Sequence, residues 1–555
     1  MRDSLRRLLQ LQMGGLIADF VTGRVRVPAP LRQEVTTRHG CSSVLRNMIQ
    51  RALGTITMLL ALAASAAPVQ PEAQPLTKQS WFEARTAYFQ IYSCGTTQEV
   101  ARIAMRLEQF REAYSLLAGA QAVASPPVLV MAFPDPAALR PFLPLYQGKP
   151  ANLTAFFNRG SDQNLIVLSL SGPETGSLKV IFHEYNHLLL RHNQPYWPMW
   201  LTEGMAEVYA TFEVVGSYRA RFGKLIDQHL RLLASRPLMP LNQLFAVTRT
   251  SPEYNERERQ GVFYSESWLL THCLMLGDNP AHKAGFRQLT PLLRQGQSPE
   301  QAFTNALHTT LPAMEAELRA YLLHGKFIPL ELPLSARLEQ RRTFTTRGLT
   351  PAEVYYRLGD ELLHIGRLDT AESYFLQARR LAPASPLPYE GLGQLAARRE
   401  HHDEAVRWLR QAAQLGPLNY LGHYTYAREK YLLTGNGSSL SPLAPEPAAE
   451  IRSGLQKSLA LLTDFGPAHQ LLGFFETVQR ENLPAALQHL EKAIQLEPEN
   501  QSYLISLAQA QLAIHDPKAA RQTLANLCLP YVEPQLRARA EDMIKTLDRP
   551  GEPAK

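Results

Sequence analysis

Cysteine and long apolar stretches are scarce in this sequence. It has four cysteines in 555 residues, and after residue 66 only Cys94, Cys273 and Cys528 remain, far apart and odd in number. This spacing argues against a disulfide framework or a cysteine metal cluster, so we expect buried thiols. Beyond residue 66 no run approaches the roughly 18 apolar residues of a membrane helix. We therefore expect no integral membrane span in the mature chain.

Charge is also weak outside the first residues. The net charge is +7, but residues 1–66 hold nine arginines, no lysine and three acidic residues, which leaves 48 basic and 47 acidic residues in the rest. A neutral body lacks the basic stripe of a nucleic-acid-binding protein, so nucleic acid is not an expected partner. The 45% hydrophobic and 19% charged content is that of a globular chain. Its length predicts two or more domains.

Residues 48–66 have the pattern of a secretory signal. Arg46 and Arg51 flank Met48, an apolar run begins at Ala52, and small residues end it at Ala66. We predict cleavage after Ala66 and a periplasmic or secreted protein. Residues 1–47 are then a doubtful upstream extension, and 67–79 a linker. The alternative is an uncleaved N-terminal anchor, although the run is short for a spanning helix.

Residues 80–330 alternate between strand and helix patterns. Strands are predicted at 82–93, 126–133 and 164–170, because these segments are rich in β-branched and aromatic residues. Helical spacing follows at 97–117, at 135–146 behind an aspartate cap, and at 181–190. From 199 to 323 only helical patterns are seen. This order predicts an α+β domain with a small sheet packed on helices.

A 34-residue repeat starts at Pro351. Gly359 and Gly393 are one period apart, as are Ala371 and Ala405, and later Ala486 and Ala520. The pattern resembles the tetratricopeptide repeat family over about 351–530. It predicts an all-α solenoid at 351–545, with an insertion near 436–450 and a linker at 331–350 before it. Such solenoids bind peptides or proteins, so we expect a domain that folds alone and recruits a protein partner.

The segment Ile181–Leu190, IFHEYNHLLL, contains H-E-x-x-H. His183 and His187 are four apart and share a helix face, and Glu184 lies beside them as a candidate base. An ordinary amphipathic helix is the alternative, but its apolar residues wrap most of the helix, and buried histidines need partners. The extended pattern with a third histidine is excluded, because Leu190 and Asn193 occupy its glycine and histidine positions.

A second motif follows at Trp200–Ala210, WLTEGMAEVYA. It resembles the W-L-x-E-G-x-A stretch of gluzincin metallopeptidases, and the chain is similar to exported peptidase-like proteins of that group. The resemblance implies a zincin-like catalytic fold and Zn²⁺ held by His183, His187 and Glu203. Glu207, four residues further on, is expected to accept the free ring N–H of a ligand histidine and so to fix its tautomer.

Two side chains are candidate donors to a developing oxyanion. Tyr264 lies in GVFYSESWLLTHCLML, which resembles the stretch after the zinc ligands in gluzincin-like proteins; a helix-packing tyrosine is the alternative. His272 is a weaker candidate. No G-x-M-E-N stretch is present, which argues against an aminopeptidase. The strand at 164–170 precedes the zinc helix and is expected to pair with substrate, which favours an endopeptidase.

The sequence therefore predicts an exported zinc metallopeptidase, with Glu184 as base, Tyr264 as catalytic donor, and a peptide or protein as substrate. Two alternatives stay open. One is a repeat-based scaffold with a non-catalytic zinc domain. The other is a zinc hydrolase that acts on non-peptide amides.

Overall fold

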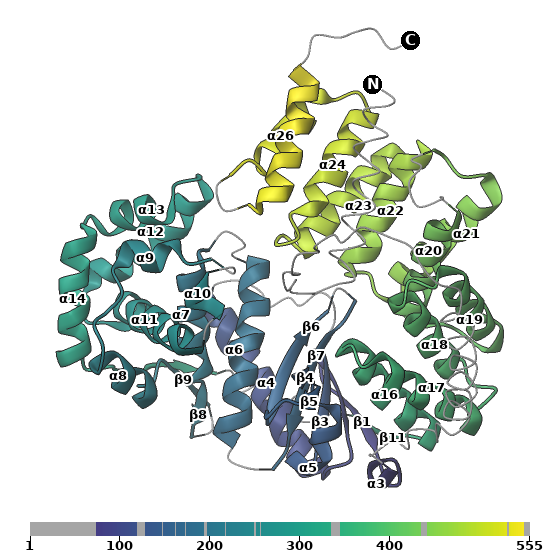
Figure 1. The fold of residues 1–555 in the computed structure, drawn as a ribbon, viewed down its shortest axis with the longest axis horizontal. Helices are drawn as coiled ribbons and strands as arrows, with labels where there is room; N and C mark the ends of the chain where they lie inside the picture. The colour runs from purple at the N-terminus through teal and green to yellow at the C-terminus, as the bar shows by residue number, and fades with distance from the viewer. Residues whose placement is uncertain are drawn as a thin grey trace, which may run out of the picture.

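The computed structural model describes residues 74–118, 128–146, 148–160, 162–171, 174–193, 197–216, 218–248, 251–255, 257–334, 345–434, 441–529 and 532–548. The predictions for 1–47, for the signal at 48–66 and for most of the linker at 67–79 lie outside these ranges. Figure 1 shows an N-terminal α+β part and an arc of paired helices that curves around one end of its sheet. In the part of the chain that the structure describes, no helix is both long and apolar enough to cross a membrane.

A six-stranded mixed sheet organises the N-terminal part, in the order β11-β1-β2-β3-β7-β6. β2, β3 and β7 run parallel, whereas β11, β1 and β6 are antiparallel to their neighbours. The strands span Phe82–Arg85 (β1), Phe89–Ser93 (β2), Val128–Phe133 (β3), Ala155–Arg159 (β6), Asn164–Ser169 (β7) and Thr345–Gly348 (β11). A short hairpin pairs β4 (Leu145–Tyr146) with β5 (Lys149–Pro150).

Both faces of the sheet are covered. Val128, Val130 and Ala132 of β3 face α4 (Thr97–Ala118) and α6 (Glu174–Asn193), whereas Leu129 and Met131 face the opposite core. That second core includes α5 (Pro136–Leu139) and the turn η1 (Arg140–Phe142). All six residues of β3 are apolar and buried, as expected for a strand that is covered on both faces.

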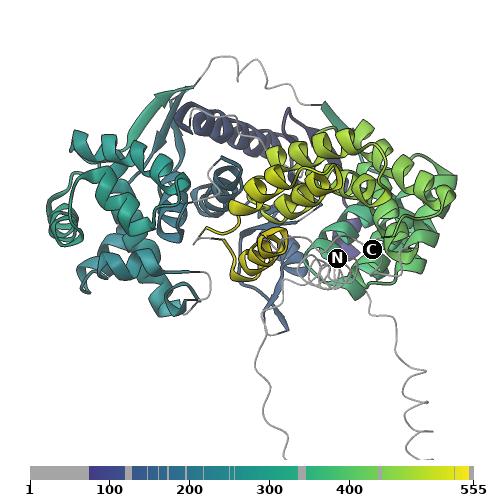
Figure 2. The ribbon, with the colours of Figure 1, turned by 90° about the horizontal axis from the view of Figure 1, so that it is seen from above.

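A helical lobe follows α6, on the opposite side of the sheet from the repeats (Figure 2). It contains α7 (Met199–Ala210), α8 (Asp227–Ala234), α9 (Leu241–Ala246), α10 (Pro252–Asn255), α11 (Arg257–Leu276), α12 (Pro280–Arg294), α13 (Pro299–Leu307) and α14 (Leu311–His324). A three-stranded sheet of β8 (Glu213–Val215), β9 (Arg219–Phe222) and β10 (Leu330–Pro333) packs beside it.

The strand predictions need three corrections. The strand predicted at 82–93 is a hairpin, in which the Thr86 hydroxyl accepts the Phe89 amide at 2.9 Å and stabilises the turn. The segment 199–323 includes β8 and β9 besides its helices. The strand at 164–170 lies inside the sheet between β3 and β6, so the sheet edge is β6. The sequence of β6 does not alternate between apolar and polar residues, so it does not predict a strand.

The repeats form a solenoid, as the 34-residue period predicts. Gly359 and Gly393 bring the helices of their pairs together, since a Cβ on either would lie within 3.0 Å of Phe375 or Leu409. The predicted contact residues Ala371 and Ala405, and likewise Ala486 and Ala520, are fully buried. The helices are α16 (Pro351–His364), α17 (Leu368–Leu381), α18 (Leu387–Arg398), α19 (His402–Leu415), α20 (Tyr420–Thr434), α21 (Pro445–Leu461), α22 (Gly466–Gln479), α23 (Leu483–Leu496), α24 (Ser502–Ala513), α25 (Pro517–Ala525) and α26 (Pro534–Asp548). Within the predicted insertion, residues 445–450 begin α21.

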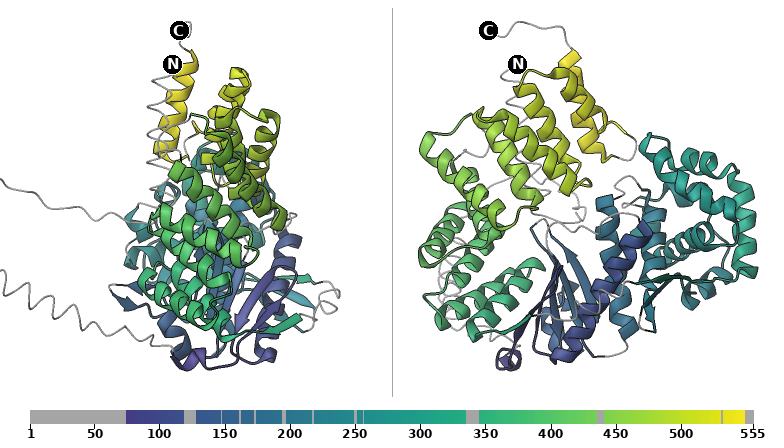
Figure 3. Two further views of the ribbon diagram at one scale, coloured as in Figure 1. Left: turned by 90° about the vertical axis from the view of Figure 1, so that its right-hand side faces the viewer. Right: turned by 180° about the vertical axis from the view of Figure 1, so that it is seen from behind.

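The first repeat does not have a core separate from the sheet, contrary to the expectation of an independent module, whereas later repeats have hydrophobic clusters of their own. The far face of the sheet and the first repeat share one hydrophobic cluster, in which Tyr92 and Met131 lie with Tyr356 and Leu358. The segment 331–350, predicted as a linker, contributes to β10 and forms β11. At its other end the arc returns to the helical lobe (Figure 3). There the Leu529 side chain would lie 3.1 Å from a Cβ on Gly296.

Candidate metal centre

Helix α6 presents His183 and His187 toward α7 because its other residues anchor it in the core. Ile181, Phe182 and Leu189 are buried, and Phe182 stacks on Phe110 of α4 with ring centroids 4.6 Å apart. The side chains of the two histidines keep 12% and 16% of their surface exposed. Apolar residues thus cover most of the helix surface, but one polar side of the helix, with His183 and His187, faces α7.

Helix α7 places Glu203 opposite that edge, and Gly204 sets how close α7 lies to α11. A Cβ at position 204 would lie 2.3 Å from the Ser267 carbonyl oxygen and 2.1 Å from the Thr271 hydroxyl. Only glycine fits so close an approach. The glycine in the E-G pair therefore fixes the depth at which Glu203 is buried.

Three side chains from the two helices meet at one point. His187 Nε2 lies 3.1 Å from Glu203 Oε2 and 3.2 Å from His183 Nε2, and His183 Nε2 lies 3.4 Å from the same carboxylate oxygen. The donor atoms of the three residues all lie within 4.8 Å of one another. Two imidazole nitrogens and one carboxylate oxygen, directed at a shared point, can hold a divalent metal such as zinc.

The ionisable groups of the cluster shift one another's pKa values. Burial opposes the charged form of Glu203, but hydrogen bonds from His183 and His187 outweigh it and lower the pKa of the carboxyl to about 2. Burial likewise disfavours charge on His183, but hydrogen bonds to Glu203 and Glu207 raise its pKa to about 10. In this form of the cluster a proton on His183 compensates the buried carboxylates, a role that a bound metal cation can also fill.

Glu207 supports the cluster from behind the candidate ligands. Its Oε1 lies 3.2 Å from His183 Nδ1, the ring nitrogen that faces away from Glu203, and its Oε2 lies 3.0 Å from His229 Nε2. The Nδ1 atom of His229 is 2.8 Å from the Ser265 hydroxyl. This places Glu207 where a carboxylate fixes the tautomer and orientation of a ligand histidine. His229 could not be predicted from the sequence, because no motif marks it.

Tyr254 and Tyr264 border the cluster. The Tyr254 hydroxyl donates to Glu203 Oε1 at 3.2 Å, and the Tyr264 ring stacks on Tyr254 and on His183 with centroids 6.1 Å away in both cases. Burial and nearby Glu203 raise the pKa of Tyr264, so it stays a protonated donor. Tyr254 lies in the four-residue helix α10, whose sequence carries no motif. His272 is buried at Tyr321 and the Gly223 carbonyl, away from the cluster.

Glu184 follows His183 on α6 and is half-buried. It precedes His187 by three residues, so the two lie on neighbouring positions of the same helix side. Neither an ion pair nor a hydrogen bond engages its carboxylate within the described residues. An uncommitted carboxylate beside two candidate ligands is free to exchange a proton with a bound molecule.

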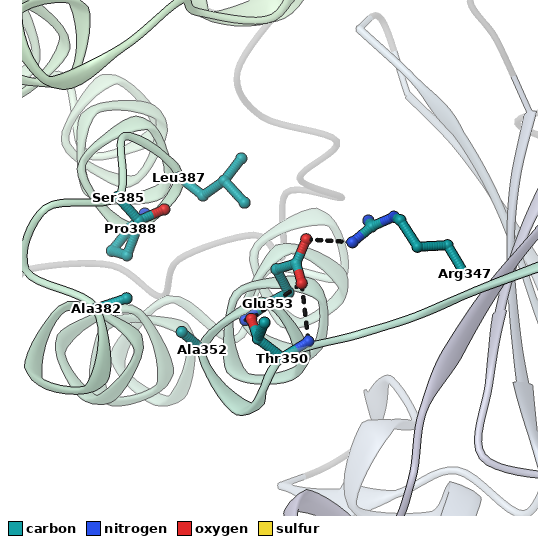
Figure 4. Close-up of a pocket in the computed structure, with 8 residues that line it drawn as sticks. All are labelled: Arg347, Thr350, Ala352, Glu353, Ala382, Ser385, Leu387 and Pro388. Atoms are coloured by element: carbon teal, nitrogen blue, oxygen red, sulfur yellow. Dashed lines mark hydrogen bonds and ion pairs between the residues drawn. The ribbon is translucent and has the colours of Figure 1, made fainter.

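A pocket of about 410 Å³ lies elsewhere, where β11 meets the first repeat (Figure 4). Arg347 and Glu353 form an ion pair of 2.7 Å in its wall, and Glu353 also accepts the Thr350 amide. Its lining is Arg347, Thr350, Ala352, Glu353, Ala382, Ser385, Leu387 and Pro388. None of these lining residues belongs to the His183 cluster, so the pocket is a separate feature.

Comparison with known families supports the C-terminal assignment. Two models of the tetratricopeptide repeat match residues 352–385 and 478–538. The C-terminal part is therefore a tetratricopeptide-repeat solenoid, a class that binds peptides and proteins. Both matches lie outside residues 80–330, so they do not bear on the metal centre.

Several solved structures are similar to about a third of the chain. YrrB, described as a TPR protein with an unusual peptide-binding site, is 17% identical, with a TM-score of 0.29 over 34% of this chain and 92% of its own. TTC0263, described as a thermophilic TPR protein of Thermus thermophilus, is 19% identical, with a TM-score of 0.28 over 35% of this chain and 99% of its own. The pilus biogenesis factor PilW is 17% identical, with a TM-score of 0.25 over 35% and 99%. No curated protein matches the chain.

Proposed function

We propose that this protein is a zinc-dependent metallopeptidase of the gluzincin type with a zincin-like N-terminal part, whose repeat solenoid is built onto that part. The observation that carries the proposal is the meeting of His183, His187 and Glu203 at one point, from two helices whose sequences carry H-E-x-x-H and W-L-x-E-G-x-A. A zinc ion bound there would polarise a peptide carbonyl and acidify a water molecule.

The chain's own residues have separate tasks in this proposal. Glu184 takes a proton from the attacking water and passes it to the leaving amine. Tyr264 donates a hydrogen bond to the oxyanion that develops on the substrate carbonyl. Glu207 orients His183 through the 3.2 Å contact at Nδ1, and Tyr254 orients Glu203. We expect an extended peptide to add to the sheet edge at β6.

A second function is favoured by the family comparisons, which match only the repeats. In that case the chain is a peptide- or protein-binding scaffold, and the His183 cluster holds a structural metal or none. The Glu184 carboxylate has no ion pair or hydrogen bond within the described residues, which favours a catalytic role, since a structural metal site does not require a base. An action on non-peptide amides uses the same residues and differs only in substrate.

The test compares the wild-type protein with Glu184→Gln, by metal analysis and by hydrolysis of a mixed peptide library. We expect about one zinc per chain in both proteins. Hydrolysis by Glu184→Gln should be slower by at least about two orders of magnitude. Glu300→Gln, at an exposed glutamate of α13, is the matched control and should cleave at the wild-type rate.

Each other outcome has a definite meaning. A wild-type protein that stays free of zinc after incubation with the metal would refute the site. A zinc-loaded wild type that cleaves no peptide supports the scaffold, unless it hydrolyses a non-peptide amide in the same assay. Cleavage that survives Glu184→Gln would assign the base to another residue.

A further inference from the structure

The edge strand β6 lies beside the candidate metal helix. It packs on α6, and among the described residues it has a hydrogen-bonded strand on one side only, β7. A strand with one free edge can accept a further extended segment. The position of β6 relative to α6 therefore fixes where such a segment would lie relative to His183.

Gly160 and Gln163, which flank the connection between β6 and β7, approach each other closely. Glycine permits this approach, because a Cβ at position 160 would lie 2.3 Å from the Gln163 carbonyl oxygen. Asp162 and Gln163 follow at the end of the hairpin. In Figures 1 and 3 this end of the sheet points into the concave side of the repeat arc.

Two repeats hold the Asp162 carboxylate. Arg398 at the end of α18 lies 2.7 Å from Oδ2, and His364 at the end of α16 lies 3.5 Å from Oδ1. The Tyr420 hydroxyl of a third repeat donates to the Asp162 backbone carbonyl at 3.4 Å. The side chains of His364 and Asp162 are only 1% and 14% exposed, so their charges are removed from water and depend on each other.

Neighbouring residues of the hairpin strengthen this attachment. The Asn158 side chain of β6 donates to the His364 carbonyl at 2.7 Å, and Gln163 donates to Asp360 at 3.2 Å. Arg159, at the end of β6, pairs with Glu499 at 2.5 Å, far along the solenoid. The concave face, which in a free solenoid is available to a partner, is at this place occupied by the chain's own hairpin.

We infer that Asp162 is a positioning residue, by which the concave face of the repeats clamps the β6–β7 hairpin and holds β6 in place beside the metal helix. The inference rests on the proposed function for its effect on substrate, but the clamp itself can be tested without activity. In this inference the first three repeats align the peptide-binding edge of the sheet. Their concave face at the hairpin does not recruit a separate protein partner.

The test measures two properties of Asp162→Asn and Arg398→Gln in the full-length protein. The first is amide hydrogen exchange of Ala155–Arg159, which should be at least about tenfold faster, because loss of a charged hydrogen bond promotes local opening. The second is peptide hydrolysis, in which KM should rise about tenfold while kcat changes less than about threefold and bound zinc is unchanged. Asp162→Glu keeps the charge and should restore most of both properties.

Arg399→Gln is the matched control, because Arg399 follows Arg398 directly but pairs with Glu372 and Asp369 of its own solenoid. It should leave β6 exchange and KM at wild-type values. Unchanged exchange of β6 in both clamp variants would overturn the clamp. Faster exchange with unchanged KM would overturn its role in substrate alignment. A wild type without peptidase activity would refute the proposed function instead, and the exchange data would still decide the clamp.

Discussion

The Tyr254 hydroxyl donates a hydrogen bond to Oε1 of Glu203, whereas both candidate ligand histidines face Oε2 of the same carboxylate. Tyr254 thereby engages Oε1 and leaves Oε2 directed at the two histidines. We expect Tyr254→Phe to weaken zinc affinity about 10- to 100-fold with the fold unchanged. Tyr264→Phe should instead retain zinc and lower kcat by about 100-fold. Competition with a chelator and single-turnover kinetics separate the two, and an exchange of these effects would exchange the two roles.

Glu203 and Glu207 are predicted to differ in the same assay. Glu203→Ala removes one of three candidate ligands and should abolish zinc retention, since two remaining ligands hold the metal poorly. Glu207→Gln keeps the shape of the side chain and should lower affinity only about 10- to 100-fold. Equilibrium dialysis against a zinc buffer measures both. If Glu207→Gln lost the metal and Glu203→Ala kept it, the ligand and the supporting residue would have to be exchanged.

Gly204 should tolerate no side chain. Gly204→Ala is expected to reduce the free energy of unfolding by about 1–3 kcal/mol, because the added methyl group collides with the backbone of α11. Gly176→Ala is the matched control, since Gly176 is exposed in α6 and a Cβ added there would have no neighbouring atom within 4 Å. It should be neutral or stabilise by up to about 1 kcal/mol. Denaturant unfolding of the two variants gives the comparison.

The contact between His364 and Asp162 predicts a pH dependence of stability. Burial disfavours charge on His364, but Asp162 and Asp360 raise its pKa from 6.5 to about 10, so its contribution is full below about pH 6.5 and is lost as pH rises toward 10. Burial opposes the charge of Asp162, but Arg398 and His364 lower its pKa below 3.8, so its contribution is lost on acidification.

The two contributions together are therefore greatest between about pH 4 and 6.5. Thermal unfolding of the wild type should show a loss of stability between about pH 6.5 and 9 that His364→Asn lacks. His401→Asn, at an exposed histidine of the second repeat, is the control and should keep the wild-type slope. Equal slopes in all three proteins would show that His364 does not titrate in the folded state as described.

The shared core predicts the effect of truncation. A chain that ends after Leu334 lacks β11 and the first repeat, and so exposes the sheet face that holds Tyr92 and Met131. We expect it to be insoluble or to lack a cooperative thermal transition. A chain that ends after Leu529 removes only α26 and should stay folded. A soluble, cooperatively unfolding chain without residues 335–555 would refute the shared core.

The repeats and the opposed motifs could be predicted from sequence because each signal is local or periodic. Ala371 and Ala405 recur at a fixed period, and His183 and His187 share a helix face by spacing alone. The edge strand could not be predicted, since Ala155–Arg159 has no alternating pattern and its register comes from β7. The roles of Tyr254 and Asp162 could not be predicted either, because their partners are distant in sequence. Glu203 is 51 residues from Tyr254, and Arg398 is 236 residues from Asp162.

The pairing of β1 with β11 also has a consequence for synthesis of the chain. Glu83 and Arg347, paired across these strands, are 264 residues apart. At about 5–20 residues per second, the ribosome needs roughly 13–53 s to make the segment between them. Until then the nascent sheet has an unpaired edge at β1 and an uncovered apolar face, so it cannot complete its fold before the first repeat emerges. Because of the order of the two parts along the chain, folding of the N-terminal part is delayed until the start of the C-terminal part has been made. During this delay the N-terminal part is exposed to aggregation or chaperone binding.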